Sequence, residues 1–147
     1  MEKIQLQSKT KALKGAIEAY WFENESIGLK NTLFHRLTIP LIAFDSGLDY
    51  EEQPVDTKIV LDWYELELSN ESHLDGLNLK HELYPDAEGS VYIGCAHNWC
   101  DVKELKISQN SNGCFTAVGE LSIEFENEGV AENELFHFRT DLDFVKA

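Results

Sequence analysis

The chain has 147 residues, 43% of them hydrophobic and 11% aromatic, and a formal net charge of −15. A chain of this size and composition can bury its own core, so we predict a single folded domain over residues 1–147 and exclude a disordered segment. The negative field repels phosphate backbones and anionic membrane surfaces, which argues against nucleic-acid and membrane partners.

The charge is unevenly distributed along the chain. Residues 1–40 hold six Lys or Arg and four Asp or Glu, a balance of +2, whereas residues 41–147 hold six and 23, a balance of −17. Such a field accelerates association with a basic protein, although solubility alone is a competing explanation. No apolar run is long enough to span a membrane, and residues 1–15 lack the apolar core of a secretory signal. We therefore predict a cytoplasmic protein whose three cysteines are reduced thiols.

The first third of the chain contains one short strand and one ambiguous segment. Residues 3–8 alternate apolar and polar side chains, which predicts a strand. Residues 9–22 place apolar side chains at helical spacing, but lysines lie at the N-terminal end and glutamates follow the C-terminal end, opposite to what a helix dipole favours. The aromatic-rich residues 15–23 fit a strand equally well, and we favour the strand. Residues 33–44 contain Pro40 and predict an edge or interrupted strand.

The middle of the chain alternates short strands with loops. Residues 45–56 form a polar loop marked by Gly and Pro. A strand follows over residues 58–68 and a shorter one over 77–83. Residues 90–95 and 102–108 predict two more strands on either side of a loop at 96–101. The sequence Asn-Ser-Asn-Gly at 110–113 predicts a hairpin turn.

The C-terminal stretch predicts two long strands, residues 114–125 and 133–144, joined by residues 126–132. Apolar side chains alternate with polar ones in both, which predicts one buried face and one mostly acidic, exposed face. The predicted interior consists of Leu66, Leu68, Tyr92, Leu121, Ile123, Phe125, Phe136, Phe138, Leu142 and Phe144. Short strands with regularly spaced turns favour a mainly β, two-layer antiparallel sandwich. An α+β fold with one N-terminal helix, about residues 9–22, packed on an antiparallel sheet is the alternative.

No motif in the chain indicates a reaction. Cys95, His97 and Cys100 could supply zinc ligands, but their spacing is loose and no second pair stands at a matching distance. A nucleophile with a histidine base has no local signature such as Gly-x-Ser-x-Gly. We predict that the protein is not an enzyme and holds no metal or cofactor. Two alternatives stay open: a ligand-binding or hydrolytic pocket near His97 and His81, and a calcium-binding β-module using the acids of residues 45–56 and 86–88.

A small, single-domain, acidic chain without export signal or catalytic motif resembles the bacterial immunity proteins, which block the active site or docking face of a toxin. The β-rich residues 89–107, GSVYIGCAHNWCDVKELKI, followed by the acidic hairpin, are part of this similarity. The resemblance implies a basic toxin, such as a nuclease, as the partner. A module that pairs through an exposed strand edge is a further alternative. The candidate partner-binding residues are Asp62, Trp63, Glu65, Glu67, Trp99, Glu120, Glu124, Glu126, Glu128, Asp141 and Asp143.

Overall fold

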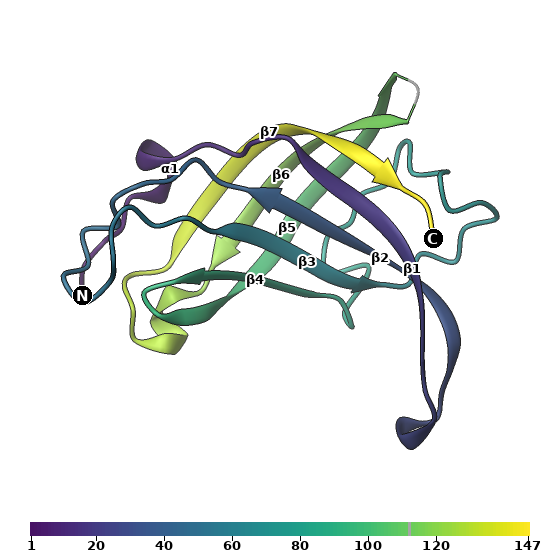
Figure 1. Cartoon of the computed structure of the whole chain (residues 1–147), viewed down its shortest axis with the longest axis horizontal. Helices are drawn as coiled ribbons and strands as arrows, with labels where there is room; N and C mark the ends of the chain where they lie inside the picture. The colour runs from purple at the N-terminus through teal and green to yellow at the C-terminus, as the bar shows by residue number, and fades with distance from the viewer. Residues whose placement is uncertain (112) are drawn as a thin grey trace.

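The computed structural model describes residues 1–111 and 113–147 and is a closed β-barrel, shown in Figure 1. Its strands are β1 (Gly15–Asn24), β2 (Leu29–Pro40), β3 (Lys58–Tyr64), β4 (Glu88–Ile93), β5 (Ala96–Ser111), β6 (Cys114–Ile123) and β7 (Glu134–Val145). Three single-turn helices accompany them: α1 (Leu6–Lys9), η1 (Glu25–Ile27) and η2 (Phe125–Glu128). The prediction of a mainly β chain is confirmed, but the two-layer sandwich is wrong, because the sheet closes on itself.

Closure depends on one parallel pairing between the two ends of the chain. Each strand pairs antiparallel with the next from β1 to β7, and residues Gly15–Glu18 of β1 then pair in parallel with Leu142–Val145 of β7. A side chain at Gly15 would collide with the backbone carbonyl of Thr38, so the approach at this seam requires glycine. Alternating strands look the same in a barrel and in a sandwich, which is why the sequence pattern left the two indistinguishable.

The ambiguous segment at residues 9–22 is resolved in favour of the strand, because β1 begins at Gly15 and the alternative N-terminal helix is absent from these residues. The strand predicted at 3–8 is wrong: α1 forms there, and Ile4 and Leu6 are buried. The loop predicted at 96–101 is also wrong, because β5 begins at Ala96 after a tight turn in which Gly94 and Cys95 have positive φ. Residues 77–83 form no strand.

The hairpin predicted at the C-terminal end is confirmed by β6 and β7, which pair from Cys114↔Asp143 to Ile123↔Glu134. The turn predicted at 110–113 includes residue 112, which lies outside the described residues. Most of the predicted interior is buried. Tyr92 is the clear error, since it is 48% exposed on the outer face of β4, and Leu68 and Phe144 are half-buried.

The β1–β2 hairpin continues beyond the body of the barrel. β2 pairs with β3 only as far as His35, and β1 pairs with β7 only as far as Glu18. Residues 19–34, which we call the arm, therefore form a two-stranded ribbon that projects at the lower right of Figure 1 and ends at η1. Trp21 and Ile27 on the arm are 58% and 73% exposed.

Candidate functional site

The end of β3 departs from regular strand geometry at Trp63. Its φ is 64°, a conformation that costs energy for a bulky side chain and is found where the surrounding structure enforces it. The departure breaks the alternation, so that Leu61 and Tyr64, three residues apart, are both buried. The indole packs edge-on against Phe22 and Phe34, with ring centroids 5.2 and 5.3 Å away. Trp63 is thereby fixed against the outer face of β1 and β2.

The carboxylate of Asp62 connects the backbone of Trp63 to the side chains of Tyr20 and Arg36. Its carboxylate accepts hydrogen bonds from the Tyr20 hydroxyl at 2.6 Å, from Nε of Arg36 at 3.0 Å and from the backbone N–H of Trp63 at 2.6 Å. Burial and the hydrogen bond to Asp62 raise the pKa of Tyr20 to about 12. The guanidinium of Arg36 also lies 4.6 Å from the Tyr20 ring centroid and 3.3 Å from Glu18. Asp62 thus positions Trp63 and has little capacity left for a partner.

A groove of about 610 Å³ opens beside Trp63. It runs between the arm and the loop that precedes β4, and its lining is Leu29, Phe34, Trp63, Glu65, Leu66, Glu67, Leu83, Tyr84, Pro85, Asp86 and Ala87. Apolar and aromatic side chains form most of this lining. Among these residues the charged side chains are Glu65, Glu67 and Asp86, all exposed, and none is basic. The groove therefore combines an apolar floor with an acidic rim.

The structure divides the predicted partner-binding residues among separate places. Trp63, Glu65 and Glu67 line the groove. Trp99 is 40% exposed on the outer face of β5, where it is paired with Ser90 and contacts His81, and it does not line the groove. The apolar residues of the 83–87 loop were not among the predicted residues, although the Tyr-Pro-Asp turn at 84–86 predicts an exposed loop. In the structure Leu83 is 56% exposed.

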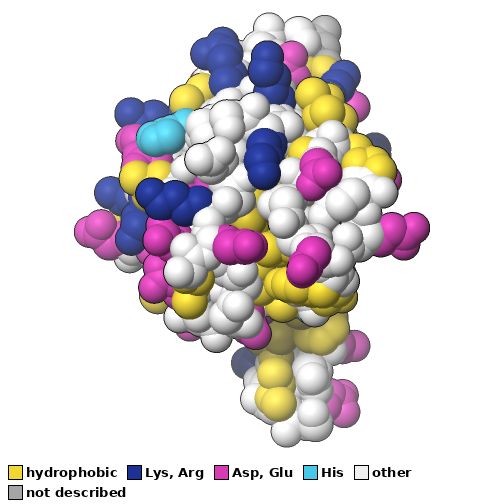
Figure 2. Space-filling model, turned by 90° about the vertical axis from the view of Figure 1, so that its left-hand side faces the viewer, with side chains coloured by type: hydrophobic (Ala, Val, Ile, Leu, Met, Phe, Trp, Pro, Cys, Tyr) yellow, Lys and Arg dark blue, Asp and Glu magenta, His cyan; other side chains and the backbone are white. Residues whose placement is uncertain are grey.

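The outer face of β5, β6 and β7 carries both charge signs, in contrast to the mostly acidic face predicted. Glu120 lies opposite Glu104 on β5 and His137 on β7. Lysines pair with acids at two places on this face: Lys106 pairs with Glu104, the cross-strand neighbour of Glu120, at 3.1 Å, and Lys14 pairs with Asp143 near the other end of β7 at 3.0 Å. Figure 2 likewise shows basic and acidic side chains interspersed over one end of the molecule. Because of these basic side chains, the negative electrostatic potential of this face is weaker than its acidic residues alone would produce.

The predicted acids near η2 have structural partners. Asn133 donates to the carboxylates of Glu124 and Glu126 at 3.0 Å each, and its own side-chain oxygen accepts the backbone N–H of Glu126 at 2.9 Å. Asp141 accepts hydrogen bonds from Thr116 and Asn110. Glu128 is exposed at the end of η2. Reversing Glu124 or Glu126 would therefore disturb this turn as well as the surface charge.

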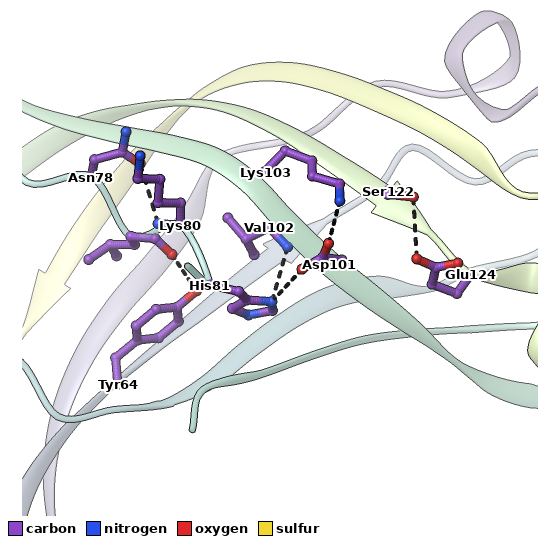
Figure 3. A network of polar contacts seen from close by, with 10 residues as sticks. Tyr64, Asn78, Lys80, His81, Asp101, Val102, Lys103, Ser122 and Glu124 are labelled. Atoms are coloured by element: carbon purple, nitrogen blue, oxygen red, sulfur yellow. Dashed lines mark hydrogen bonds and ion pairs between the residues drawn. The ribbon is translucent and has the colours of Figure 1, made fainter. Parts of the chain in front are cut away.

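The two histidines of the alternative pocket lie in different places: His97 lines a pocket of about 400 Å³ together with Lys58 and Tyr92, and His81 is not part of that lining. Figure 3 shows His81 turned toward β5, where Nδ1 accepts the backbone N–H of Val102 at 3.1 Å and lies 3.2 Å from a carboxylate oxygen of Asp101. Lys103 lies 2.6 Å from the other oxygen of that carboxylate. His97 sits four residues from Asp101 on the same strand, about 13 Å away, and packs on Tyr92. The two imidazoles do not face a common site.

One buried histidine, His35, and one half-buried histidine, His81, predict a pH-dependent stability. Burial lowers the pKa of His35, whose Nε2 lies 2.9 Å from the Glu71 carbonyl, and it lowers the pKa of His81 against the opposing effect of Asp101. The unfolded chain therefore binds protons on these rings at higher pH than the folded chain. The free energy of unfolding should fall as the pH drops below about 6.5, by at most about 1.4 kcal/mol per pH unit for each ring.

Urea denaturation at a series of pH values measures this effect. His35→Gln, which keeps a side-chain donor, should flatten the slope below about pH 6.5, whereas His73→Gln at an exposed position should not. An unchanged slope in the His35 variant would show that this ring does not titrate differently in the two states.

The cysteines are dispersed: Cys95 is exposed in the turn after β4, Cys100 is buried in the barrel and Cys114 is partly covered. Burial raises the pKa of the Cys100 thiol. The acidic loop at 45–56 is tied into the fold, since Glu51 accepts hydrogen bonds from Ser46 and from the backbone of Gly94. Among the described residues, no group of three or more His, Cys, Asp or Glu side chains is arranged to hold a metal ion.

Comparison with family models gave no match, and comparisons with curated proteins and with solved structures gave none either. In the part of the chain that the structure describes, no helix is both long and apolar enough to cross a membrane.

Proposed function

We propose that this protein is an acidic binding protein that neutralises a basic protein partner, in the manner of an immunity protein blocking a toxin such as a nuclease. In this proposal the protein acts in the cytoplasm as a stoichiometric inhibitor and catalyses no reaction. The observation that carries the proposal is the groove beside Trp63, with an apolar floor and a rim of Glu65, Glu67 and Asp86.

The groove has features that favour both a high affinity for a protein partner and fast association with it. Aromatic side chains in well-packed pockets supply most of the affinity in protein interfaces, and Trp63 is held in place by three other aromatic rings. Negative charge around the pocket, added to the net charge of −15, attracts a basic partner over a distance and raises the association rate. A basic surface with a protruding apolar side chain would match this arrangement.

The shape of the barrel favours binding at its surface. Apolar side chains from all seven strands fill the interior, including the fully buried Leu37, Leu61, Leu105 and Leu121. The groove beside Trp63 lies on the outside of the barrel, between the arm and the 83–87 loop. A folded partner can reach such a groove with an exposed segment, whereas a small substrate would be poorly enclosed.

In this proposal the partner is the product of the adjacent gene, and the test measures its association with this chain by surface-binding kinetics. The triple variant Glu65→Gln, Glu67→Gln, Asp86→Asn removes the rim charges. It should lower the association rate about tenfold at low salt, and the loss should shrink at physiological ionic strength, where screening acts beyond about 8 Å. Thermal stability should change little, because these side chains are exposed.

A charge-matched control separates local from global electrostatics. Asp49→Asn, Glu52→Gln, Glu128→Gln removes the same charge from exposed positions that do not line the groove. If both triple variants slow association equally, only the net charge matters and the groove is not the docking site. If the wild-type chain binds no basic neighbour, the proposed function is wrong.

A further inference from the structure

The arm presents an unpaired strand edge along the groove. On one side, residues 32–34 and Leu29 of β2 pair with β1 around a β-bulge at residues 30–31, but on the other side the register with β3 stops at His35. No backbone hydrogen bond in the described part of the chain joins Asn31 or Leu33 to a residue beyond the β1–β2 pair. Unpaired edges invite pairing with another chain, and an isolated two-stranded ribbon is only marginally stable in water.

Hydrogen bonds at the other end of β2 show which backbone groups face this edge. Leu41 donates its N–H to Thr57, on the β3 side, while Pro40 accepts from Leu13, on the β1 side. Backbone groups alternate from side to side along a strand. The register of β2 with β1 is unbroken from Thr38 to Thr32. Continuing this alternation, Leu33 directs its N–H and C=O groups to the open side, whereas Lys30 and Asn31 lie in a β-bulge, where the alternation is interrupted.

The open edge and the groove form one surface. Leu29 and Phe34, near the two ends of the unpaired stretch, both line the groove, and Trp63 packs on Phe34. Six residues of edge span about 20 Å, which is enough for a short added strand. Side chains of an added strand would alternate between the groove and solvent.

We propose that the partner docks by adding an extended, basic segment as a strand to the β2 edge of the arm, with an apolar side chain seated beside Trp63. This inference rests on the proposed function and specifies its binding mode. Charge selects the occupant: the groove contributes Glu65, Glu67 and Asp86, so a lysine- or arginine-rich segment is favoured. A second copy of this chain, which also carries a net charge of −15, would be repelled.

Proline at position 33 tests the backbone pairing. Leu33→Pro removes an N–H that faces the open edge, which leaves the β1–β2 ladder intact but blocks an incoming strand. Its matched control is Leu33→Ala, which removes the same half-buried side chain and keeps the N–H. Against the basic protein encoded beside this chain, the proline variant should bind about tenfold more weakly or worse, and the alanine variant within about twofold.

Hydrogen exchange gives a second readout. Amide exchange in residues 29–34 should slow on complex formation, by about tenfold or more at Leu33, because its N–H gains a partner. Equal binding by the proline and alanine variants without amide protection would overturn strand addition, while a loss of binding on neutralising the acidic rim would still support the proposed function. Sedimentation of the free chain as a dimer that Leu33→Pro dissociates would show that a second copy occupies the edge, and would also overturn the proposal.

Discussion

Replacing Phe138 by alanine is expected to lower the free energy of unfolding by about 3–5 kcal/mol. Phe138 on β7 lies opposite Gly119 on β6, and a Cβ added at Gly119 would lie 2.6 Å from its ring. The glycine thus leaves the space that the ring fills. The ring also lies 6.2 Å from that of Phe136, so truncation leaves a cavity between two neighbouring strands in the closed barrel.

Urea denaturation of the variant and the wild type measures this loss. Leu135→Ala is the matched control, because Leu135 lies on the same strand but is 53% exposed, and its variant should stay within about 0.5 kcal/mol of wild type. A loss below about 1 kcal/mol for Phe138→Ala would mean that the ring is not part of a packed interior.

Replacing Trp63 by alanine is expected to weaken partner binding by about 2–4 kcal/mol, or roughly 30- to 1,000-fold in Kd. Trp63 is the largest side chain lining the groove, and its removal would expose Phe22 and Phe34, which it now covers. The loss should appear mainly as faster dissociation, in contrast to the slower association expected when the rim charges are removed.

Titration calorimetry with the basic protein encoded beside this chain provides the affinities. Trp99→Ala is the control of equal size, since Trp99 is 40% exposed but does not line the groove. Circular dichroism should show that both variants are folded at the temperature of the titration. A greater loss of affinity with Trp99→Ala than with Trp63→Ala would move the docking site to the outer face of β4 and β5.

The sequence correctly predicted the strands in which apolar and polar side chains alternate along the chain. The β6–β7 hairpin followed from the period of two in residues 114–125 and 133–144, because a strand with one buried face shows it directly. The same reasoning failed at β3. Trp63 has a left-handed backbone conformation that no sequence pattern predicts. The alternation of buried and exposed side chains therefore shifts by one residue at this point.

Closure of the barrel could not be predicted because it is a long-range event. The parallel contact of Gly15–Glu18 with Leu142–Val145 joins segments more than a hundred residues apart, and nothing local in either stretch specifies it. Residues 76–81 illustrate the same limit. The sequence predicted a strand at 77–83, but residues 76–81 donate backbone hydrogen bonds to β5 from Gly76, Leu79 and His81 without forming a regular strand.

The candidate site could be predicted only in part. Trp63, Glu65 and Glu67 stood out as an aromatic residue among acids, and the structure brings them to one groove. Asp86 and the apolar residues of the 83–87 loop line the same groove, but only the tertiary structure brings them there. The net charge on the surface of the C-terminal hairpin could not be predicted from the hairpin alone, because a compensating lysine comes from elsewhere in the chain, as Lys14 does for Asp143.

Carboxylate footprinting by mass spectrometry tests the docking site most directly. It compares the acids of the groove with those of the C-terminal hairpin in one experiment. The free chain and its complex with the basic neighbour are labelled with a carbodiimide and an amine, and each modified acid is quantified. Docking at the groove predicts protection of Glu65, Glu67 and Asp86, with unchanged labelling of Glu120, Glu128 and Asp141. Protection of the second set with continued labelling of the first would contradict the groove as the docking site.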